Sequence, residues 1–338
     1  MDWDTQTGRY EPGDIVLGSG EVLRNASLNW KSYGTLSADR GNVIVFPTSY
    51  SAQHRDQEWL IGPDGILDPT RWFIVVPDMF GNGLSSSPSH APDYPALVTT
   101  ADNVRMQRRL LTDVFGIDAV ACVYGFSMGG QQAYHWAALY PDAVERAIVV
   151  CGSARTAVHN QVFLQALQAT LEAAPEHLGG GRFSSQPDAA MRAFARIYAT
   201  MALSQDWYRA NLHLTPSGAA SLDDFLDRVW APGFLRRKAE DLYAQCSTWL
   251  ASDISANALY QGDLVLALQS IRVRMLLMPS RTDLYFPVAD NAGEMAHLRH
   301  AELRPIPSIW GHRAGNPATN PADAAFLRNA VREWLSRT

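Results

Sequence analysis

A serine between two glycines is the feature of this 338-residue sequence with the clearest chemical meaning. Ser127 lies in Gly125-Phe126-Ser127-Met128-Gly129 and so matches the pattern G-x-S-x-G. An apolar run, AVACVY, leads into the pattern, and a helical stretch, MGGQQAYHWAALY, leaves it. A tight turn between a strand and a helix exposes the serine hydroxyl, and the glycines let the two elements cross closely. We therefore predict a nucleophilic serine. The alternative, a surface serine in a glycine-rich turn, does not require these flanks.

A serine hydroxyl is a weak nucleophile, so the chain must also supply a base and an acid. In sites of this kind the partners follow in the order serine, acid, histidine. Asp283 follows the apolar run 273–279 closely, and His312 lies in the loop Gly311–Gly315, ahead of the last helical pattern. We predict that Ser127, Asp283 and His312 form a catalytic triad.

The three members of this triad have separate expected tasks. The serine would attack an acyl carbon, the histidine would take its proton and return it to the leaving group, and the aspartate would hold the histidine tautomer. Asp290, on the next predicted helix, is the alternative acid. His297 and His300 are spaced like a metal pair, but no third ligand is evident, so we expect a solvated surface and no metal.

An acyl-enzyme mechanism also needs backbone donors for the oxyanion of the tetrahedral intermediate. One donor is expected to be the N–H of Met128, the residue after the nucleophile. The other is expected in the loop 47–51, which follows the apolar run Asn42–Phe46. Within that loop the sequence leaves both Ser49 and Tyr50 open.

The elements around these residues indicate an α/β fold with a mostly parallel sheet. Short apolar runs predict strands at Asn42–Phe46, Trp72–Val76, Ala119–Val123, Ala147–Val150, Val273–Met278 and, more weakly, Glu302–Ile306. An alternating stretch over Glu21–Gly34 predicts an antiparallel strand pair at a sheet edge, which brings the total to eight strands. Amphipathic patterns predict helices at Thr100–Phe115, Met128–Tyr140 and Pro321–Arg337.

Residues 155–270 break this alternation and are mostly helical, with patterns at Phe163–Ala173, Ala189–Leu203, Leu222–Trp230 and Arg237–Ala251. We interpret this segment as a helical cap inserted into a core that comprises residues 1–154 and 271–338. The cap follows a strand on the sheet edge that carries the nucleophile, so it should cover the active site. Its aromatic residues indicate an apolar substrate pocket or the interior of the cap: Phe163, Phe194, Tyr198, Trp207, Trp230 and Trp249. Of these, Phe163, Phe194 and Trp230 are our candidates for the pocket.

Composition and charge exclude several classes of protein. A net charge of −6 without clustered basic residues argues against nucleic-acid binding. The N-terminal stretch does not resemble a signal peptide, and no apolar run approaches the length of a membrane span. Cys122, Cys151 and Cys246 show no metal-binding or disulfide spacing. We expect a cytoplasmic protein that has no cofactor and no membrane partner.

Four segments carry a resemblance to a known family: VVPDMFGNGLSSSPS at 75–89, GFSMGGQQAYHWAALYPD at 125–142, SRTDLYFP at 280–287 and GHRAG at 311–315. Across most of its length the chain resembles the homoserine O-acetyltransferase family of α/β hydrolases. The resemblance implies the α/β-hydrolase fold, a helical lid and the triad predicted above. The chain departs from the acetyltransferases in two segments: PTSYS in the oxyanion loop, and FGNGLSSSPSHAP after the predicted strand Trp72–Val76. These departures make it more similar to the branch that hydrolyses short esters.

These observations predict a serine hydrolase that acts on short-chain, acetyl-type esters through an acyl-enzyme. The first alternative is an acyltransferase that moves an acetyl group from acyl-CoA to homoserine or another small alcohol. In that case the basic run Arg236–Lys238 in the cap could bind CoA, although a solvated helical face is the simpler interpretation. The second alternative is a non-enzymatic ligand receptor on a hydrolase scaffold. A homodimer is possible through the aromatic-rich cap.

Overall fold

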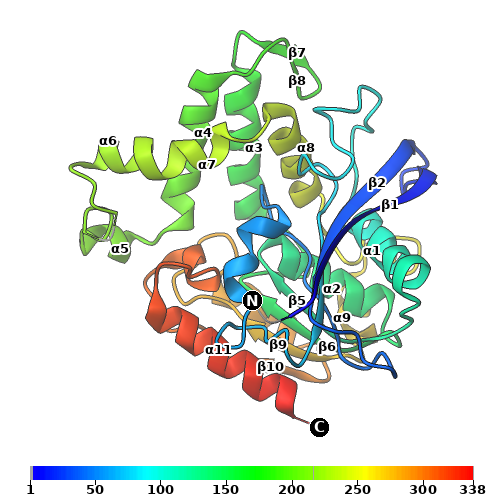
Figure 1. The fold of residues 1–338 in the computed structure, drawn as a ribbon. Helices are drawn as coiled ribbons and strands as arrows, with labels where there is room; N and C mark the ends of the chain where they lie inside the picture. Colours follow the sequence, from blue (N-terminus) through cyan, green and yellow to red (C-terminus); the bar gives the residue numbers. More distant parts are fainter. Residues whose placement is uncertain (1–2, 216, 338) are drawn as a thin grey trace.

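An eight-stranded sheet forms the centre of the structure, a computed structural model that describes residues 3–215 and 217–337 (Figure 1). The strand order is β1-β2-β4-β3-β5-β6-β9-β10. These strands are β1 (Thr5–Val16), β2 (Val22–Tyr33), β3 (Val43–Val45), β4 (Phe73–Pro77), β5 (Val120–Phe126), β6 (Val144–Val150), β9 (Arg274–Met278) and β10 (Ala301–Leu303). The β1–β2 and β2–β4 pairs are antiparallel and the others parallel, which confirms the predicted α/β class and eight-stranded sheet.

The central strands are covered on both faces, and this is why they appear in the sequence as continuous apolar runs. Successive residues of β3 point to opposite faces: Val43 and Val45 pack in one hydrophobic cluster, and Ile44 packs in another. Helices α1 (Thr100–Phe115), α2 (Met128–Leu139) and α9 (Leu264–Ser270) contribute to the first cluster. Helix α11 (Pro321–Ser336) covers the opposite face. Helix α10 (Val288–Met295) follows β9.

The predicted strand pair within residues 21–34 was wrong. Those residues form one long strand, β2, whose partner β1 was not predicted. Strand β1 is the edge of the sheet, and most of its side chains are exposed or only partly buried. Its sequence, TQTGRYEPGDIV, therefore lacks the apolar pattern from which the other strands were recognised.

A helical layer lies beyond the sheet edge at which β5 ends, at the top of Figure 1. It contains α3 (Val158–Glu172), α4 (Asp188–Ala202), α5 (Gln205–Arg209), α6 (Leu222–Phe225), the π-helical turn η3 (Leu226–Trp230), α7 (Ala231–Leu235), α8 (Ala239–Leu250) and the short hairpin β7 (His177–Gly179) and β8 (Arg182–Phe183). The layer has its own hydrophobic cluster, which continues into core residues such as Tyr50, Met128 and Tyr285. The cap is therefore packed directly onto the site edge of the core.

The end of the predicted cap segment does not belong to this layer. Ala267 and Leu268 of α9 pack with the core cluster beside α2, and not with the cap. A helix pattern alone does not show which layer the helix joins, so the predicted boundary at residue 270 stays a prediction. We propose that the cap proper ends with α8.

Candidate active site

The turn between β5 and α2 places the serine hydroxyl above the sheet. Ser127 has φ 58° and ψ −125°, a strained conformation for a residue with a side chain. Glycine is required on both sides of it by close contacts. A Cβ on Gly125 would lie 2.0 Å from the carbonyl oxygen of Gly129, and a Cβ on Gly129 would lie 2.7 Å from that of Pro47. The glycines of the motif thus allow the strand, the helix and the loop after β3 to meet.

The structure brings together the three residues predicted as a triad. The Nε2 atom of His312 lies 2.9 Å from Oγ of Ser127, and its Nδ1 atom lies 2.7 Å from Oδ2 of Asp283. The backbone N–H groups of Tyr285 and Phe286 donate to the other carboxylate oxygen, at 2.8 and 3.2 Å. All three predicted side chains are buried. This continuous chain of hydrogen bonds has the geometry needed to move a proton away from the serine.

The imidazole of His312 is held by its surroundings. It lies in η4 (Gly311–Gly315), and the N–H of Gly311 donates to Oγ1 of Thr282 at 3.0 Å. The rings of Phe126 and Tyr285 lie within 5 Å of the imidazole, centroid to centroid. Asp290, the alternative acid, lies on α10 and forms no hydrogen bond with His312 in the described chain. The geometry therefore favours Asp283.

Cys151 is a neighbour of the triad that the sequence analysis did not assign to the site. Its Sγ and the ligand atoms of Asp283 and His312 lie within 4.8 Å of one another. Burial raises the pKa of the Cys151 thiol well above its usual value, and the nearby Asp283 carboxylate acts in the same direction. A neutral thiol is a poor metal ligand. We therefore interpret this group as packing around the acid and not as a metal centre.

The loop after β3, where the second oxyanion donor was predicted, is held on several sides. Thr48 accepts a hydrogen bond from the N–H of Met79 through Oγ1 and one from Nε2 of Gln132 through its carbonyl, both at 2.9 Å. Within the described residues, no group accepts a hydrogen bond from the backbone N–H of Ser49, Tyr50 or Met128. The loop therefore presents unused donors beside the nucleophile, and both candidates for the second donor remain open.

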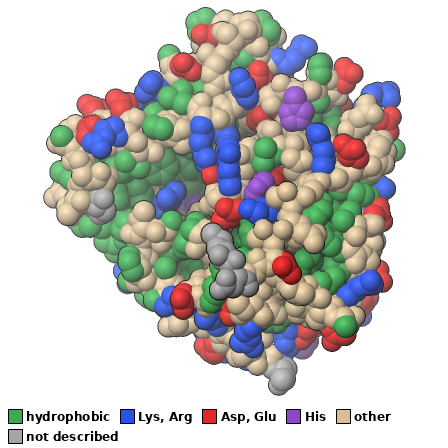
Figure 2. Space-filling model, in the orientation of Figure 1, with side chains coloured by type: hydrophobic (Ala, Val, Ile, Leu, Met, Phe, Trp, Pro, Cys, Tyr) green, Lys and Arg blue, Asp and Glu red, His purple; other side chains and the backbone are tan. Residues whose placement is uncertain are grey.

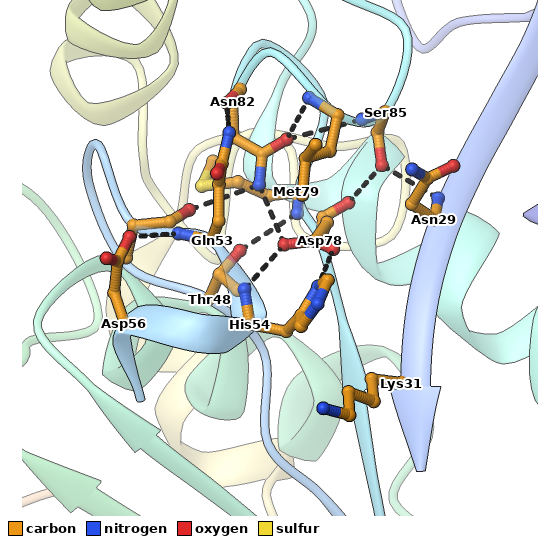
Figure 3. Close-up of polar contacts among 12 residues, drawn as sticks. Asn29, Lys31, Thr48, Gln53, His54, Asp56, Asp78, Met79, Asn82 and Ser85 are labelled. Atoms are coloured by element: carbon orange, nitrogen blue, oxygen red, sulfur yellow. Dashed lines mark hydrogen bonds and ion pairs between the residues drawn. The ribbon is translucent and has the colours of Figure 1, made fainter. Parts of the chain in front are cut away.

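A buried polar network fixes the far end of the same loop (Figure 3). The Asp78 carboxylate accepts hydrogen bonds from the backbone N–H of His54 at 2.8 Å and from Nδ2 of Asn82 at 2.9 Å, and Nδ1 of His54 lies 2.7 Å away. Asn82 also donates to the carbonyl of Ala52, and its own carbonyl accepts from Gln53. The segment 75–89, recognised from sequence only by resemblance, thus holds the loop in place.

Two cap arginines bind the same region. Arg236 and Arg237 both contact the carboxylate of Asp56, at 2.7 and 2.5 Å, and Nε of Arg237 donates to the carbonyl of Ser51 at 2.7 Å. Burial of the Arg237 guanidinium lowers its pKa, and Arg236 beside it acts in the same direction. The interpretation of this run as a solvated face was wrong for Arg237, which is buried, whereas Arg236 is exposed although it is ion-paired. Their acidic partner lies about 180 positions earlier, where sequence spacing cannot reveal it.

A cavity of about 480 Å³ opens over Ser127 and His312, between core and cap. It is seen as a hollow on the left of the molecule in Figure 2, with hydrophobic side chains in its wall. Its aromatic lining is Tyr50, Trp59, Phe126, Tyr198, Trp207, Phe225, Trp230, Phe234 and Trp310. The cavity is therefore a mainly apolar site that reaches the nucleophile.

Of the three predicted pocket residues, only Trp230 lines this cavity. The rings of Phe163 and Phe194 pack against Tyr198 instead, at centroid distances of 5.6 and 6.2 Å. Tyr198 and Trp207, which the sequence offered as cap aromatics without assigning them to the pocket or to the cap interior, do line the cavity. Tyr198 occupies the same helix as Phe194, and only the packing of that helix decides which ring faces the cavity.

Comparison with known proteins gives a consistent result. A family model described as "alpha/beta hydrolase fold" matches residues 59–312. The chain is 36% identical to a probable esterase of Corynebacterium glutamicum, over 90% of each chain. It is 34% identical to the ethyl acetate hydrolase of Pseudomonas veronii, over 89% of this chain and 87% of that enzyme. The solved structure of the acetyl esterase MekB superposes with a TM-score of 0.93, at 31% identity, over 98% of this chain and 97% of that one.

Homoserine acyltransferases are also among its relatives. The chain is 30% identical to the homoserine O-acetyltransferase of Zymomonas mobilis, over 56% of each chain. The identity to the two esterases is thus higher, and their matches span more of the chain than the match to this acetyltransferase. This confirms the resemblance that the sequence motifs indicated, including its inclination toward the esterase branch.

Proposed function

The chain belongs to the α/β-hydrolase fold family, and we propose that within it this protein is a carboxylic ester hydrolase for short, acetyl-type esters. The observation that carries the proposal is the hydrogen-bonded series Ser127–His312–Asp283 in the wall of the cavity. The full-length relatives named as an esterase and an ethyl acetate hydrolase support it.

In the proposed mechanism Ser127 attacks the carbonyl carbon of the ester while His312 takes the proton from its hydroxyl. The tetrahedral intermediate collapses, the alcohol leaves with that proton, and an acyl-serine remains. His312 then takes a proton from a water molecule, which attacks the acyl-serine and releases the acid. Asp283 keeps Nδ1 of the imidazole protonated and stabilises the imidazolium.

We propose that the oxyanion is bound by the N–H of Met128 and by the N–H of either Ser49 or Tyr50. These groups have no acceptor among the described residues. Met128 is also the first residue of α2, where the helix dipole and free N–H groups favour negative charge. The contacts of Thr48 hold the loop donors near the nucleophile before substrate arrives, so little reorganisation is needed during the reaction.

Water, and not an acyl acceptor alcohol, is the proposed second substrate. A transferase of this kind needs a basic site for CoA, and two of the three residues of the basic run Arg236–Lys238 are already engaged, because Arg236 and Arg237 both pair with Asp56. O-acyl transfer to homoserine is the second candidate, and the similarity to homoserine O-acyltransferases is the observation in its favour.

A panel of p-nitrophenyl esters from acetyl to octanoyl, together with ethyl acetate, tests this proposal. We expect fastest turnover for acetyl esters and the same rate with or without homoserine. Acetyl-homoserine formed from acetyl-CoA faster than ester is hydrolysed would favour the transferase. Ser127→Ala is the control, with kcat lower by roughly four to six orders of magnitude if the precedent of serine proteases transfers. A folded wild-type chain whose serine fails to react with a phosphonate would instead support a receptor.

The cytoplasmic location and the homodimer stay proposals. In the chain as described, no helix has both the length and the apolar character needed to cross a membrane. The three cysteines are buried and unpaired, which supports a reducing compartment. Size-exclusion chromatography with light scattering would decide between monomer and dimer.

A further inference from the structure

A basic side chain in the wall of the cavity is not explained by ester hydrolysis alone. Arg313 follows His312 directly and lines the same cavity as Ser127. Its side chain is exposed to that space. Figure 2 shows Lys or Arg side-chain atoms (blue) within the hollow, among hydrophobic side chains (green). Arg313 is therefore placed where a bound ester would meet it.

Arg313 has no acidic partner in the described part of the chain. The structure shows no ion pair and no side-chain hydrogen bond for it, and the groups that affect its pKa are the tyrosines Tyr198 and Tyr285. The surrounding protein lowers this pKa, because the guanidinium has lost part of its hydration. Partly desolvated arginines are usually paired, so this one has unused binding capacity.

The other charges in the cavity wall cancel one another. Besides Arg313, the charged lining residues are Asp56 and Arg236, which form an ion pair at 2.7 Å. Arg237, just behind, shares the same carboxylate. Among the described residues that line this mainly apolar cavity, Arg313 is thus the cation that has no carboxylate partner. In such surroundings, attraction between a cation and an anion is stronger than in water.

We propose that Arg313 binds a carboxylate on the substrate, so that the preferred esters carry one negative charge besides the scissile short-chain ester. The planar guanidinium matches a carboxylate through two parallel N–H···O bonds. A single unpaired guanidinium balances a monoanion, which favours a carboxylate over a phosphate dianion. The carboxylate belongs to either the alcohol or the acyl part. This proposal rests on the proposed esterase function and deepens it.

Matched ester pairs test the idea. For the alcohol side, 3-acetoxypropanoate is compared with its amide, 3-acetoxypropanamide. For the acyl side, monoethyl succinate is compared with ethyl succinamate. In the wild type we expect kcat/KM for the carboxylate of at least one pair to exceed that of its amide by roughly ten- to a hundredfold, the effect of one charge-assisted hydrogen-bonded contact. The pair that shows the preference identifies the side that carries the charge.

Arg313→Gln should reduce the ratio of kcat/KM between carboxylate and amide to about one. Arg313→Lys keeps the charge but not the planar guanidinium, so it should give an intermediate ratio. Arg236→Gln is the matched control, since it removes a cation that is already paired, and it should keep the wild-type preference. Rates are normalised to active serines counted with a phosphonate. A preference that survives Arg313→Gln would overturn the proposal, as would equal rates within both pairs in the wild type.

A second measurement does not depend on the variants folding. Butyrate and butyramide are compared as inhibitors of wild-type hydrolysis of p-nitrophenyl acetate, and butyrate should bind at least tenfold more tightly. Equal inhibition by the two would count against the carboxylate site. If the wild type hydrolyses none of these esters, nor p-nitrophenyl acetate, the esterase function itself fails, which is a separate result.

Discussion

At the scale of single residues, the site depends on a few backbone conformations that most side chains avoid. Ser127 and Cys151 both have positive φ, at 58° and 47°, and Gly311 has φ 57°. Close contacts between segments accompany these conformations. For example, a Cβ on Gly311 would lie 2.8 Å from the carbonyl oxygen of Ala202, at the end of α4. The strain at Ser127 aims its hydroxyl at His312, and the surrounding contacts maintain it.

Replacement of the acid tests the assignment of the triad. Asp283→Asn should fold but lose kcat by roughly ten-thousandfold, as in the serine-protease precedent, because an amide no longer sets the tautomer of His312. Asp290→Asn should stay near wild type, since Asp290 does not contact the imidazole. Turnover of p-nitrophenyl acetate by the two variants is the measurement. Normal turnover by Asp283→Asn with loss in Asp290→Asn would move the acid to Asp290.

At the scale of elements, the cap and the oxyanion loop are tied together. The short link between α7 and α8 carries the arginines that contact Asp56 and Ser51. Oε1 of Gln245 on α8 accepts a hydrogen bond from the N–H of Ser51 at 2.8 Å. Ser51 itself has φ 58°. The position of the cap is therefore coupled to the loop that offers the second oxyanion donor.

Loss of the buried arginine should affect the chemical step more than binding. Arg237→Gln leaves Asp56 with one partner and frees the carbonyl of Ser51, so we expect kcat to fall about ten- to a hundredfold with a smaller change in KM. The free energy of unfolding should fall by about 1–3 kcal/mol. Steady-state kinetics and urea denaturation measure the two effects.

The matched control for this prediction is Arg228→Gln, which breaks an exposed cap ion pair with Asp224 at 3.0 Å. It should change neither quantity much, because exposed ion pairs contribute little to stability. If Arg237→Gln raised KM alone, the contacts of Arg237 with Asp56 and Ser51 would serve substrate binding and not the position of the loop.

The two layers of aromatic residues in the cap should respond differently to truncation. Trp230→Ala enlarges the cavity and should change the ratio of kcat/KM between acetyl and hexanoyl esters in favour of the longer chain. Phe194→Ala removes a fully buried ring from the interior of the cap and should cost about 3–5 kcal/mol of stability. Its ester ratio should stay closer to wild type. The reverse pattern would place Phe194 in the pocket.

At the scale of the whole molecule, one buried carboxyl joins core helices to the start of the cap. Glu294 on α10 accepts hydrogen bonds from Tyr134 on α2 at 2.6 Å, from Asn291 at 2.7 Å and from the N–H of Ala154 at 2.7 Å. Burial raises the pKa of Glu294 from 4.5 to about 7, although the hydrogen bonds act in the opposite direction. Its ionisation is therefore coupled to folding.

The raised pKa predicts how stability changes with pH. Between pH 4.5 and about 7, the folded state holds a proton on Glu294 that the unfolded state has lost, so the contribution of this group to stability falls as pH rises through that window. Glu294→Gln should therefore show a smaller loss of unfolding free energy from pH 5 to pH 8 than the wild type. Urea denaturation at a series of pH values measures this. An equal or larger loss in the variant would contradict the raised pKa.

The nucleophile elbow and the buried strands could be predicted from the sequence, because both depend on local residue patterns. The elbow needs glycines at fixed offsets from Ser127, and strands buried on both faces need continuous apolar residues. Both patterns can therefore be recognised in the sequence. The order of elements then placed Asp283 and His312 after later strands, at the same edge of the sheet. The family, the α/β class and the mostly parallel sheet followed from these patterns.

Contacts between residues far apart in the sequence depend on the packing of the folded chain. The pairing of Arg237 with Asp56, the network around Asp78 and the unpaired state of Arg313 depend on how the cap and loops pack, and residue spacing does not encode this. The same holds for the cavity lining, because the sequence could not separate Tyr198, which faces the cavity, from Phe194, which does not. The edge strand β1 was missed for a related reason: with one neighbour and little burial, it needs no apolar pattern, and its partner β2 defines it.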